Sequence, residues 1–525
     1  MRWCARYMGL LLATLILAIA ACGGGATATP GAATTVSGVP SAPGEERVLK
    51  VAMTFLDEVP DPYQAGWLAV PAGLSETLFR LGNNLKPEPW LATGATQINP
   101  TTWEITLREG VKFHNGVLMD AAKVKGSLDL ASERRPGTRI LLDIDQIEVK
   151  DPTTVIIHTN SPNPIMPGLL TNYNTSIADP DTVPASTEDS AELAAMTGPY
   201  KLGSFTADQK MNVTAHSDYW QGPPAMDRVE YVAFTDSNTR LISLQSGDVD
   251  IAINLSPQGA VVVGNDSSLE VRTAPPSGML FMFVNHESPA MQDPLVRWAI
   301  AIAVDREAMS EGVADGNAVP AKTMFPPGFL SCPNMTGYSY DPGAARLLLA
   351  EAGYQDENGD GIVEKDGKPL ELVLQTYPEQ PLLPPMLEAF QSMLRDIGVG
   401  AKVQIVEWTL ASQGGYDLFG YSNGTTTTGD PQWAFTKQYL TGGDENRGNF
   451  SNPRVDELIG QLTGASDPAQ RQQVACETLQ KGQNEVALIP VMFPNRLYGI
   501  SNSVDWTSGP HASQFYFIDH LIGLK

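Results

Sequence analysis

Residues 104–130, EITLREGVKFHNGVLMDAAKVKGSLDL, predict a strand, a tight turn and a helix in direct succession. Ile105 and Leu107 alternate with polar residues, as on a half-buried strand. Asn115 and Gly116 suit a tight turn because both residues tolerate a positive φ. Asp120 can accept hydrogen bonds from the free N–H groups of the helix that it opens. The segment is therefore a strand–turn–helix unit without a catalytic group.

Strands and helices alternate along the rest of the chain. Asp293-Pro294 and Asp341-Pro342 each place an N-cap aspartate before a proline, whose missing N–H would be unsatisfied anyway. The segment 70–81, VPAGLSETLFRL, also predicts a helix. A strand, a helix and a strand follow at 372–376, 386–397 and 401–406. This alternation is typical of an α/β fold with a parallel sheet and covering helices.

The first 22 residues predict a lipoprotein signal peptide. Arg2 and Arg6 precede an apolar run at 9–21, and residues 19–22, IAAC, follow the bacterial lipobox pattern. Thirteen residues at ~1.5 Å each make ~20 Å of helix, which is too short for the ~30 Å core of a bilayer. Cys22 is then the lipidation site, and we expect lipid anchoring at the extracytoplasmic face of the cell membrane. The alternative is an ordinary secretory signal with a chance cysteine.

Composition narrows the class of partner. The segment 23–46 is almost wholly small and polar residues and predicts a flexible linker. The chain has 34 basic and 59 acidic residues, a net charge of −25, which argues against nucleic acid as a partner.

Cys332 and Cys476 remain after the signal peptide and the lipidation site are set aside. Export would place them in a disulfide-permissive compartment, so either a bridge or two buried thiols is expected.

Several further stretches share one order along the chain. They are TGPYKL (197–202), DYWQGPPAMDRVEY (218–231), LQSGDVDIA (244–252), DPLVRWAIAIAVDREAM (293–309), YDPGAARLLLAEAGY (340–354) and SNPRVDELI (451–459). Together with the opening segment they resemble the bacterial extracellular solute-binding proteins of family 5, which serve peptide and nickel importers. The resemblance implies a two-lobed periplasmic-binding-protein-like fold of type II, with an extra α/β subdomain in the first lobe.

The resemblance also implies a division of the chain. Its expected parts are a signal peptide (1–22), a linker (23–46), lobe I (47–81), the extra subdomain (82–196), lobe I again (197–275), lobe II (276–487) and a return to lobe I (488–525).

The function that the resemblance implies is solute capture by closure of the two lobes. A monomeric binding protein would take a peptide-like or metal-chelate solute and deliver it to the permease and ATPase subunits of an ABC importer. No reaction and no cofactor are expected. The chain has no GxSxG elbow and no Gly-rich phosphate loop. A secreted hydrolase and a sensory binding protein without a transport role remain the alternatives.

The ligand class stays open at the sequence level. In peptide binders of the family, an aspartate three residues before a late Asp-Pro pair takes the ligand's ammonium group. Here the pair is Asp430-Pro431, and the matching position is Thr427. A neutral hydroxyl cannot provide that charge-assisted bond.

Aromatic and amide side chains are the candidates for a wide binding cleft, because rings offer apolar faces and amides offer both a donor and an acceptor. The predicted ligand-binding residues are Tyr63, Trp67, Tyr173, Tyr421, Asn423 and Trp433, with Arg139 as a candidate anion partner. The alternative for each is a packed core aromatic or a capped turn.

An acidic stretch is the candidate metal site. Asp356, Asn358 and Asp360 in DENGDGIVEKDG resemble the first half of a calcium loop. Position 12 is Gly367, where an EF-hand needs a bidentate glutamate, so a plain hairpin turn is the alternative. No two of the six histidines have the spacing of transition-metal ligands.

Overall fold

The computed structural model describes residues 46–184, 193–333, 335–378, 380–411, 413–513 and 516–525. The predicted signal peptide, Cys22 and residues 23–45 of the predicted linker lie outside the described residues. Residues 46–525 form one compact unit. In the described part of the chain, no helix combines the length and apolar character that a membrane span requires.

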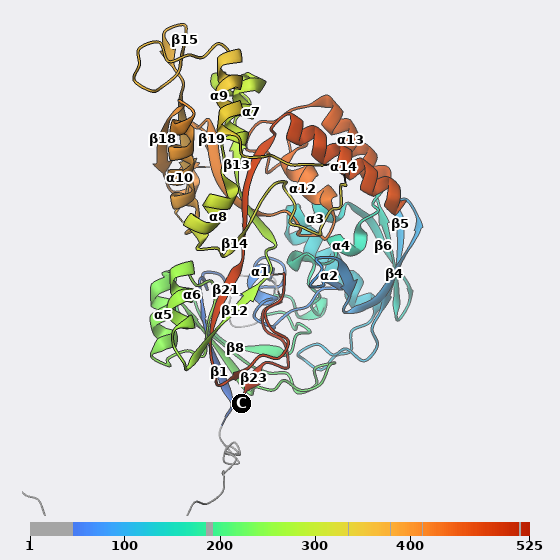
Figure 1. The fold of residues 1–525 in the computed structure, drawn as a ribbon. Helices are drawn as coiled ribbons and strands as arrows, with labels where there is room; N and C mark the ends of the chain where they lie inside the picture. The colour runs from blue at the N-terminus through green and yellow to red at the C-terminus, as the bar shows by residue number, and fades with distance from the viewer. Residues whose placement is uncertain (1–45, 185–192, 334, 379, 412, 514–515) are drawn as a thin grey trace, which may run out of the picture. The chain divides into compact units, whose positions relative to one another are not determined.

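The first large sheet has seven strands in the order β12-β21-β11-β1-β10-β9-β8 (Figure 1). Its members are β1 (Val48–Met53), β8 (Tyr200–Thr206), β9 (Lys210–Ala215), β10 (Arg228–Ala233), β11 (Ile251–Ala252), β12 (Leu269–Ala274) and β21 (Arg496–Ser501). The central strand β1 is parallel to β10 and β11, whereas the other pairs are antiparallel. The helices α5 (Ser237–Gln245) and α6 (Pro257–Gly264) pack on this sheet. The N-cap of α5 is Asp236.

The second large sheet has six strands in the order β14-β20-β13-β19-β17-β18. They are β13 (Gly278–Val284), β14 (Ala318–Pro320), β17 (Glu371–Thr376), β18 (Gly400–Ile405), β19 (Leu418–Gly424) and β20 (Leu488–Pro494). Strand β17 is parallel to β18 and β19, as the sequence alternation predicts. The prediction of a parallel sheet is wrong for the sheet as a whole, because β13 is antiparallel to both β19 and β20.

Most of the helices between β13 and β20 along the chain are longer than one turn. They are α7 (Pro294–Ile302), α8 (Arg306–Ala314), α9 (Pro342–Glu351), α10 (Leu383–Asp396), α12 (Pro431–Gln438), α13 (Pro453–Gly464) and α14 (Pro468–Asn484). Asp293 and Asp341 cap α7 and α9, with a proline at the first helical position of each, as predicted. A disulfide joins Cys332 to Cys476 of α14 with a Cα–Cα distance of 5.6 Å, so the bridge rather than two free thiols is formed.

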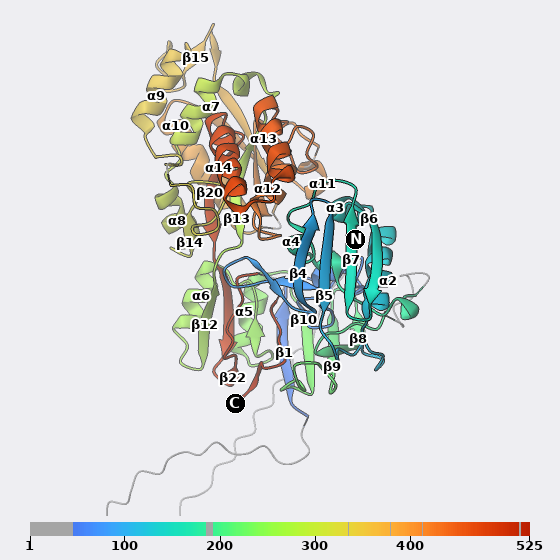
Figure 2. The same cartoon turned by 90° about the vertical axis from the view of Figure 1, so that its right-hand side faces the viewer.

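The segment 104–130 contributes a strand to a separate four-stranded sheet (Figure 2). Its order is β4 (Ala92–Asn99), β5 (Thr102–Leu107), β7 (Thr154–Thr159) and β6 (Ile144–Asp151), with α2 (Ala121–Arg134) and α3 (Pro136–Leu142) beside it. The predicted strand–turn–helix unit is confirmed. Gly116 has a φ of 87°, and the Asp120 side chain accepts from the Lys123 N–H at 2.9 Å.

The helix predicted at 70–81 is wrong. The chain forms only the short α1 (Gly66–Ala69), then turns, and then β2 (Phe79–Leu81), which pairs with β3 (Pro87–Pro89). Gly73 takes a φ of 74°, which no right-handed helix allows. Residues 70–79 are all buried. The apolar pattern of this stretch therefore reflects enclosure by other elements and not one face of a helix.

The remaining elements are short. They are α4 (Met166–Leu169), α11 (Trp408–Ala411), the 3₁₀ turns η1 (Tyr173–Thr175), η2 (Pro180–Thr182) and η3 (Pro289–Gln292), and the hairpin strands β15 (Glu364–Lys365), β16 (Lys368–Pro369), β22 (Val504–Asp505) and β23 (Gly523–Leu524). The chain passes between the two large sheets twice, at residues 275–277 after β12 and at Asn495 after β20.

Candidate ligand-binding cleft

Two cavities share Tyr173 as a lining residue; the first borders β13 and β19 of the second large sheet, whereas the second borders β1 and β21 of the first. The first has a volume of about 340 Å³ and is lined by Leu81, Asn172, Tyr173, Ser277, Gly278, Ser422, Asn423, Gly424, Thr426, Thr427, Trp433, Glu445 and Ser513. The second has a volume of about 420 Å³ and is lined by Met53, Thr54, Phe55, Trp67, Pro71, Tyr173, Ile253, Asn254, Arg496, Tyr498 and Phe517. We call the two together the cleft.

Tyr173 owes its place at the centre of the cleft to its neighbours. Asn172 caps η1 by accepting from the Asn174 N–H at 3.0 Å. A Cβ atom on Gly66 would lie 2.3 Å from the backbone oxygen of Tyr173, so only glycine allows this approach of α1. Burial raises the pKa of the Tyr173 hydroxyl, which therefore stays protonated at neutral pH. The ring stands as a wall common to both cavities.

The loop after β19 closes one side of the first cavity. A Cβ atom on Gly168 would lie 2.2 Å from the backbone oxygen of Thr428, so this loop packs directly against α4. Lys86 Nζ donates to the backbone oxygen of Gly429 at 3.2 Å, and Thr426 Oγ1 donates to that of Ser277 at 3.0 Å. The first two contacts join the loop to segments outside the second large sheet, and the third joins it to the residue before β13, so the loop is held beside the cavity.

Glu445 brings a carboxylate to the first cavity. Burial raises its pKa above the ordinary value, and the neighbouring Asp444 adds to the effect, whereas Lys437 opposes it. Asn423 Nδ2 donates to Glu445 Oε2, so the amide orients the acid. Thr427 Oγ1 donates to the backbone oxygen of Gly424 at 3.1 Å. The first cavity thus presents an oriented acceptor, together with neutral hydroxyl and amide groups.

The Asp-Pro pair of the sequence analysis has a structural role here. Asp430 caps α12 by accepting from the Gln432 N–H at 2.8 Å. It also forms an ion pair with Arg471 Nη2 at 2.8 Å. Trp433 follows on the same helix, and its ring lies 4.7 Å from Lys437 Nζ. The helix start therefore places Trp433, and not Asp430, on the cavity wall.

The structure brings four of the predicted ligand-binding residues to the cleft: Trp67, Tyr173, Asn423 and Trp433. Trp67 lines the second cavity, where its Nε1 donates to Glu58 Oε2 at 3.2 Å. Thr427, the position of the missing aspartate, also lines the first cavity.

Three predicted residues lie elsewhere. Tyr63 is fully buried in the core beside the first large sheet, and its hydroxyl lies 3.1 Å from Ser127 Oγ. Burial raises the pKa of Tyr63 to about 12. Arg139 is exposed on α3 and lines neither cavity. Tyr421 stacks on Trp408, with ring centroids 5.8 Å apart, and lines neither cavity. Aromatic character alone did not separate packed rings from lining rings.

Glu445 and Arg496 are the cleft residues that sequence reasoning missed. Glu445 stands in GGDENRG, which has the composition of an ordinary polar turn. Arg496 follows the apolar run LIPVMFPN, and a single basic residue after a buried strand was the one available signal. Both residues gain their significance only from the enclosure that the fold gives them.

A larger cavity of about 640 Å³ is lined by residues that lie outside the second large sheet, among them Gly73, Glu76, Trp90, Tyr219 and Trp506. One of its walls is the buried Glu76, whose carboxylate accepts from Tyr219 Oη at 2.7 Å and from two ring nitrogens, Trp90 Nε1 at 2.8 Å and Trp220 Nε1 at 3.1 Å. Burial raises the pKa of Glu76 to about 7, although the hydrogen bonds from Tyr219 and Trp220 favour its ionised form.

The same network includes two arginines. Arg80 lies 3.8 Å above the ring of Trp90, and Arg108 lies 4.2 Å above that of Trp220. We call Glu76, Tyr219, the two tryptophans and these two arginines the Glu76 network. No strand of the second large sheet borders this cavity, and the same holds for the second cavity of the cleft. Of these three cavities, the first cavity of the cleft is the one that combines η1 with β13 and β19 of the second large sheet, and it is therefore the better candidate for solute capture.

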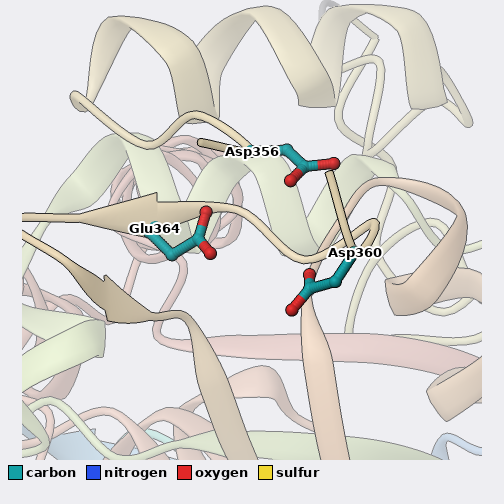
Figure 3. Close-up of side chains that lie close together, drawn as sticks. All are labelled: Asp356, Asp360 and Glu364. Atoms are coloured by element: carbon teal, nitrogen blue, oxygen red, sulfur yellow. The ribbon is translucent and has the colours of Figure 1, made fainter. Parts of the chain in front are cut away.

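The predicted calcium loop brings three carboxylates together, those of Asp356, Asp360 and Glu364, within 4.8 Å of one another (Figure 3). Glu364 is the third carboxylate of this group and was not among the predicted calcium ligands. Asp356 accepts from the Gly359 N–H at 2.7 Å, and Asp360 accepts from the Ile362 N–H at 2.8 Å. The loop thus uses its acids as turn acceptors, and calcium binding stays a prediction.

Comparison with known proteins places the chain in a family. The sequence profile described as "Bacterial extracellular solute-binding proteins, family 5 Middle" matches residues 86–446. The nickel-binding protein NikA of Staphylococcus aureus is 26% identical over 89% of this chain and 93% of the relative. The glutathione-binding protein GsiB of Salmonella paratyphi A is 28% identical over 88% of this chain and 91% of the relative.

A solved structure agrees with these relatives. The crystal structure of Staphylococcus aureus NikA in complex with Ni(L-His)2 superposes with a TM-score of 0.77 and 25% identity, covering 91% of this chain and all of that one. The predicted two-lobed α/β fold of type II is thereby confirmed, and so is the resemblance on which it rested. The chain belongs to the bacterial extracellular solute-binding proteins of family 5.

Proposed function

We propose that this protein captures a small solute, peptide-like or a metal chelate, in the cleft and delivers it to the permease and ATPase subunits of an ABC importer. The observation that carries the proposal is that two distant parts of the chain line the first cavity, Asn172 and Tyr173 at η1 on one side and Asn423, Thr427 and Glu445, in and after β19 of the second large sheet, on the other. A ligand that contacts both sides favours the state in which they are close. The relatives bind nickel and glutathione, which agrees with a solute of this size.

The finer parts of the proposal concern the ends of the chain and its division. We propose lipid attachment at Cys22, a tether at residues 23–46 and a monomeric body that catalyses no reaction. The proposed lobes are those of the sequence division, with the boundary to the returning segment moved from residue 488 to Asn495. The change is supported by β20, which belongs to the second large sheet, and β21, which belongs to the first.

The test is native mass spectrometry of the full-length protein, before and after mild denaturation. A discrete released mass is expected, and it names the solute. Thr427→Trp should abolish its retention, because the larger ring fills the first cavity. The matched control is Thr273→Trp on the edge strand β12, where the side chain is exposed. Retention by the first variant would place the solute outside the first cavity. Loss of retention in the second variant as well would show that the effect of Thr427→Trp is not specific to that cavity.

Transport and sensing would use the same cleft, and uptake separates them. Deleting the protein from its host should abolish accumulation of the labelled solute, and restoring the Cys22→Ala form should restore it only in part. Unchanged accumulation in the deletion strain would leave a sensory role. Turnover of hydrolase substrates by the purified protein would contradict the absence of catalysis.

A further inference from the structure

The turn between β2 and β3, residues 82–86, has an unusual backbone for its sequence. The Gly82 N–H donates to the Lys86 backbone oxygen, and the Leu85 N–H donates to that of Gly82, each at 2.8 Å. Leu85 takes a φ of 58° within this turn, a left-handed conformation that glycine and asparagine adopt far more readily than leucine. The strained backbone indicates that contacts outside the turn hold Leu85 in place.

Leu85 packs into the core of the second large sheet. Its side chain is buried and belongs to the hydrophobic cluster formed by the strands and helices between β13 and β20. Among the buried members of that cluster in the described part of the chain, only Leu85 and Ala512 come from outside residues 279–493. The Ala512 N–H donates to Asn83 Oδ1 at 3.0 Å, so the turn contacts both of these residues. An early segment of the chain thus enters the core of the second large sheet at this turn.

Lys86 contacts the same part of the molecule through its ammonium group. Part of its side chain is exposed, but Nζ donates to the backbone oxygens of Phe329 and Gly429, each at 3.2 Å. Nζ also lies 4.4 Å from the centre of the Phe329 ring, within the range of a cation–π interaction. A Cβ atom on Gly429 would lie 2.8 Å from the Leu85 backbone oxygen, so glycine is needed for this approach. We call Phe329 and Gly429 the receiving pair.

The disulfide between Cys332 and Cys476 restrains one member of the receiving pair. Phe329 lies in the stretch between β14 and α9, whose described residues form no helix or strand. Its ring stacks on that of Phe325, with ring centroids 5.3 Å apart. Cys332 follows shortly after Phe329, and the disulfide joins it to α14. Because this stretch lacks the regular backbone hydrogen bonds of a helix or sheet, a covalent bond close to Phe329 restricts its position.

The turn and the receiving pair belong to different parts of the chain. The turn precedes the crossing at residues 275–277, whereas the receiving pair lies between that crossing and the one at Asn495. Any rotation of one large sheet relative to the other therefore moves the turn against the receiving pair. The contact also lies close to the cleft, because Leu81 just before the turn and Thr427 just before the receiving glycine line the first cavity.

We propose that the Cys332–Cys476 disulfide keeps Phe329 where Lys86 can bond to it, and that reduction of this disulfide weakens the hold on the turn and favours opening of the cleft. This inference rests on the proposed function, since opening and closing have a role only if the cleft captures a solute. Gly429 keeps its bond to Lys86 in the reduced protein, so reduction removes part of the contact and not all of it.

A small dithiol can carry out the reduction. Both cysteines are half-buried and line a cavity of about 420 Å³, together with Ser331, Met335 and Gln472. One thiolate of the dithiol attacks a disulfide sulfur, and its second thiol then resolves the mixed disulfide. Two electrons and two protons pass to the protein, the S–S bond becomes two thiols, and the dithiol becomes a cyclic disulfide. The protein gains the mass of two hydrogens, which verifies the reaction.

The experiment compares hydrogen–deuterium exchange of the full-length protein before and after reduction with dithiothreitol, read peptide by peptide in a mass spectrometer. Exchange at residues 82–86 should become about 3-fold faster, because one of the two hydrogen bonds of Lys86 Nζ is weakened. Small-angle X-ray scattering of the same samples should show a larger radius of gyration after reduction. If dithiothreitol leaves the bond intact, the double variant Cys332→Ser, Cys476→Ser takes the place of the reduced protein.

Two results would overturn the proposal at this stage. Faster exchange confined to residues 325–333 and α14 would show that the disulfide acts only on its own surroundings. An unchanged radius of gyration would show that the cleft does not open when the bond is reduced.

Lys86→Met separates the contact from a general loss of stability. Exchange at residues 82–86 should become about 10-fold faster in this variant, because both hydrogen bonds of Nζ are lost while the apolar chain remains. Reduction should then change that exchange by less than about 1.5-fold, since the Phe329 oxygen has already lost its donor. The matched control is Lys402→Met, at an exposed lysine of the edge strand β18, which should behave as the wild type. A full effect of reduction in Lys86→Met overturns the proposal.

The outcomes for the wild-type protein keep the two proposals apart. Faster exchange at the turn on reduction, with a released solute in the native mass spectrum, supports both. The same exchange result without a released mass or uptake supports the link between the disulfide and the turn and counts against solute capture. Unchanged exchange at the turn with a released solute overturns this inference alone. Because these readouts need no variant, the test holds even if Lys86→Met does not fold.

Discussion

The Glu76 network and the cleft differ in how many hydrogen-bond partners their enclosed charged groups have. In the Glu76 network, one carboxylate receives three side-chain donors and two arginines lie over the tryptophan rings. In the cleft, Arg496 keeps two donors without a partner among the described residues. Glu445 stands at a cavity with an amide as its side-chain donor. A saturated network fixes the architecture, whereas a buried group without a hydrogen-bond partner costs free energy.

The largest expected contrast is between two arginines. Arg306→Met should lower the free energy of unfolding by about 4 kcal/mol, because three buried backbone oxygens lose their donor. Arg496→Met should cost about 1 kcal/mol or less, because the loss of two hydrogen bonds is offset by removal of an unpaired charge. Urea unfolding of both variants checks this. Equal losses would show that Arg496 is as structural as Arg306 and would remove the comparison.

Glu76 gives the next largest effect, and it depends on pH. Burial raises the pKa of Glu76 to about 7, from an ordinary value of 4.5. Between these values the folded protein keeps a proton that the unfolded chain has lost, so the contribution of Glu76 to stability falls as pH rises. The stability of the wild type relative to Glu76→Gln should fall by roughly 3 kcal/mol from pH 4 to pH 8.

The check on Glu76 is urea unfolding of both proteins across that range, since other titrating groups cancel in the difference. A difference that does not change with pH would mean that the hydrogen-bond donors hold the carboxylate ionised in the folded state. The donors would then stabilise the negative charge of Glu76 as well as occupy its acceptor positions, which would strengthen the contrast with the cleft.

Substitution of Glu445 should affect ligand binding more than stability, in contrast to Glu76, whose carboxylate already accepts three side-chain hydrogen bonds. Glu445→Gln is expected to change the free energy of unfolding by less than about 1 kcal/mol, because one side-chain hydrogen bond is at stake. Binding of the solute identified by mass spectrometry should weaken by about 10-fold if that solute has a cationic donor. Calorimetric titration and urea unfolding of the same sample separate the two effects. A large loss of stability with unchanged affinity would place Glu445 among the structural acids.

The smallest effect concerns a saturated group on the surface. Asp120→Ala should cost about 1 kcal/mol, because the Lys123 N–H loses its acceptor at the start of α2. The matched control is Asp129→Ala on the same helix, where an exposed pair with Lys125 is lost at a cost of about 0.5 kcal/mol or less. Thermal unfolding measures both. Equal costs would mean that the cap contributes no more than a surface ion pair.

Local signals predicted much of the fold. Asp120, Asp293 and Asp341 each begin a helix where the sequence predicts an N-cap, since capping depends on residues within one turn. The strand register and the mixed pairing of the second sheet were not accessible, because antiparallel and parallel neighbours are set by residues hundreds of positions apart. The helix prediction at 70–81 was wrong for a similar reason, because the burial of this stretch comes from distant segments.

The cleft was only partly predictable for a physical reason. Trp67 and Trp433 line it, whereas the equally aromatic Tyr63 is packed in a core. A ring has the same composition in both settings, and only tertiary placement separates them. Arg496 and Glu445 carry no motif at all. Their role follows from enclosure and from missing partners, which are properties of the folded chain.

The two passages of the chain between the large sheets have a mechanical consequence. Any change in the angle between the sheets has to be absorbed in residues 275–277 and at Asn495, because no other covalent path joins them. Ser277 belongs to one cavity of the cleft, and Arg496 follows Asn495 in the other. A solute bound in the first cavity would therefore lie beside Ser277, at one of these two passages. Its dissociation rate could be tuned through the stiffness of Pro275 and Pro276, without altering any side chain that touches it.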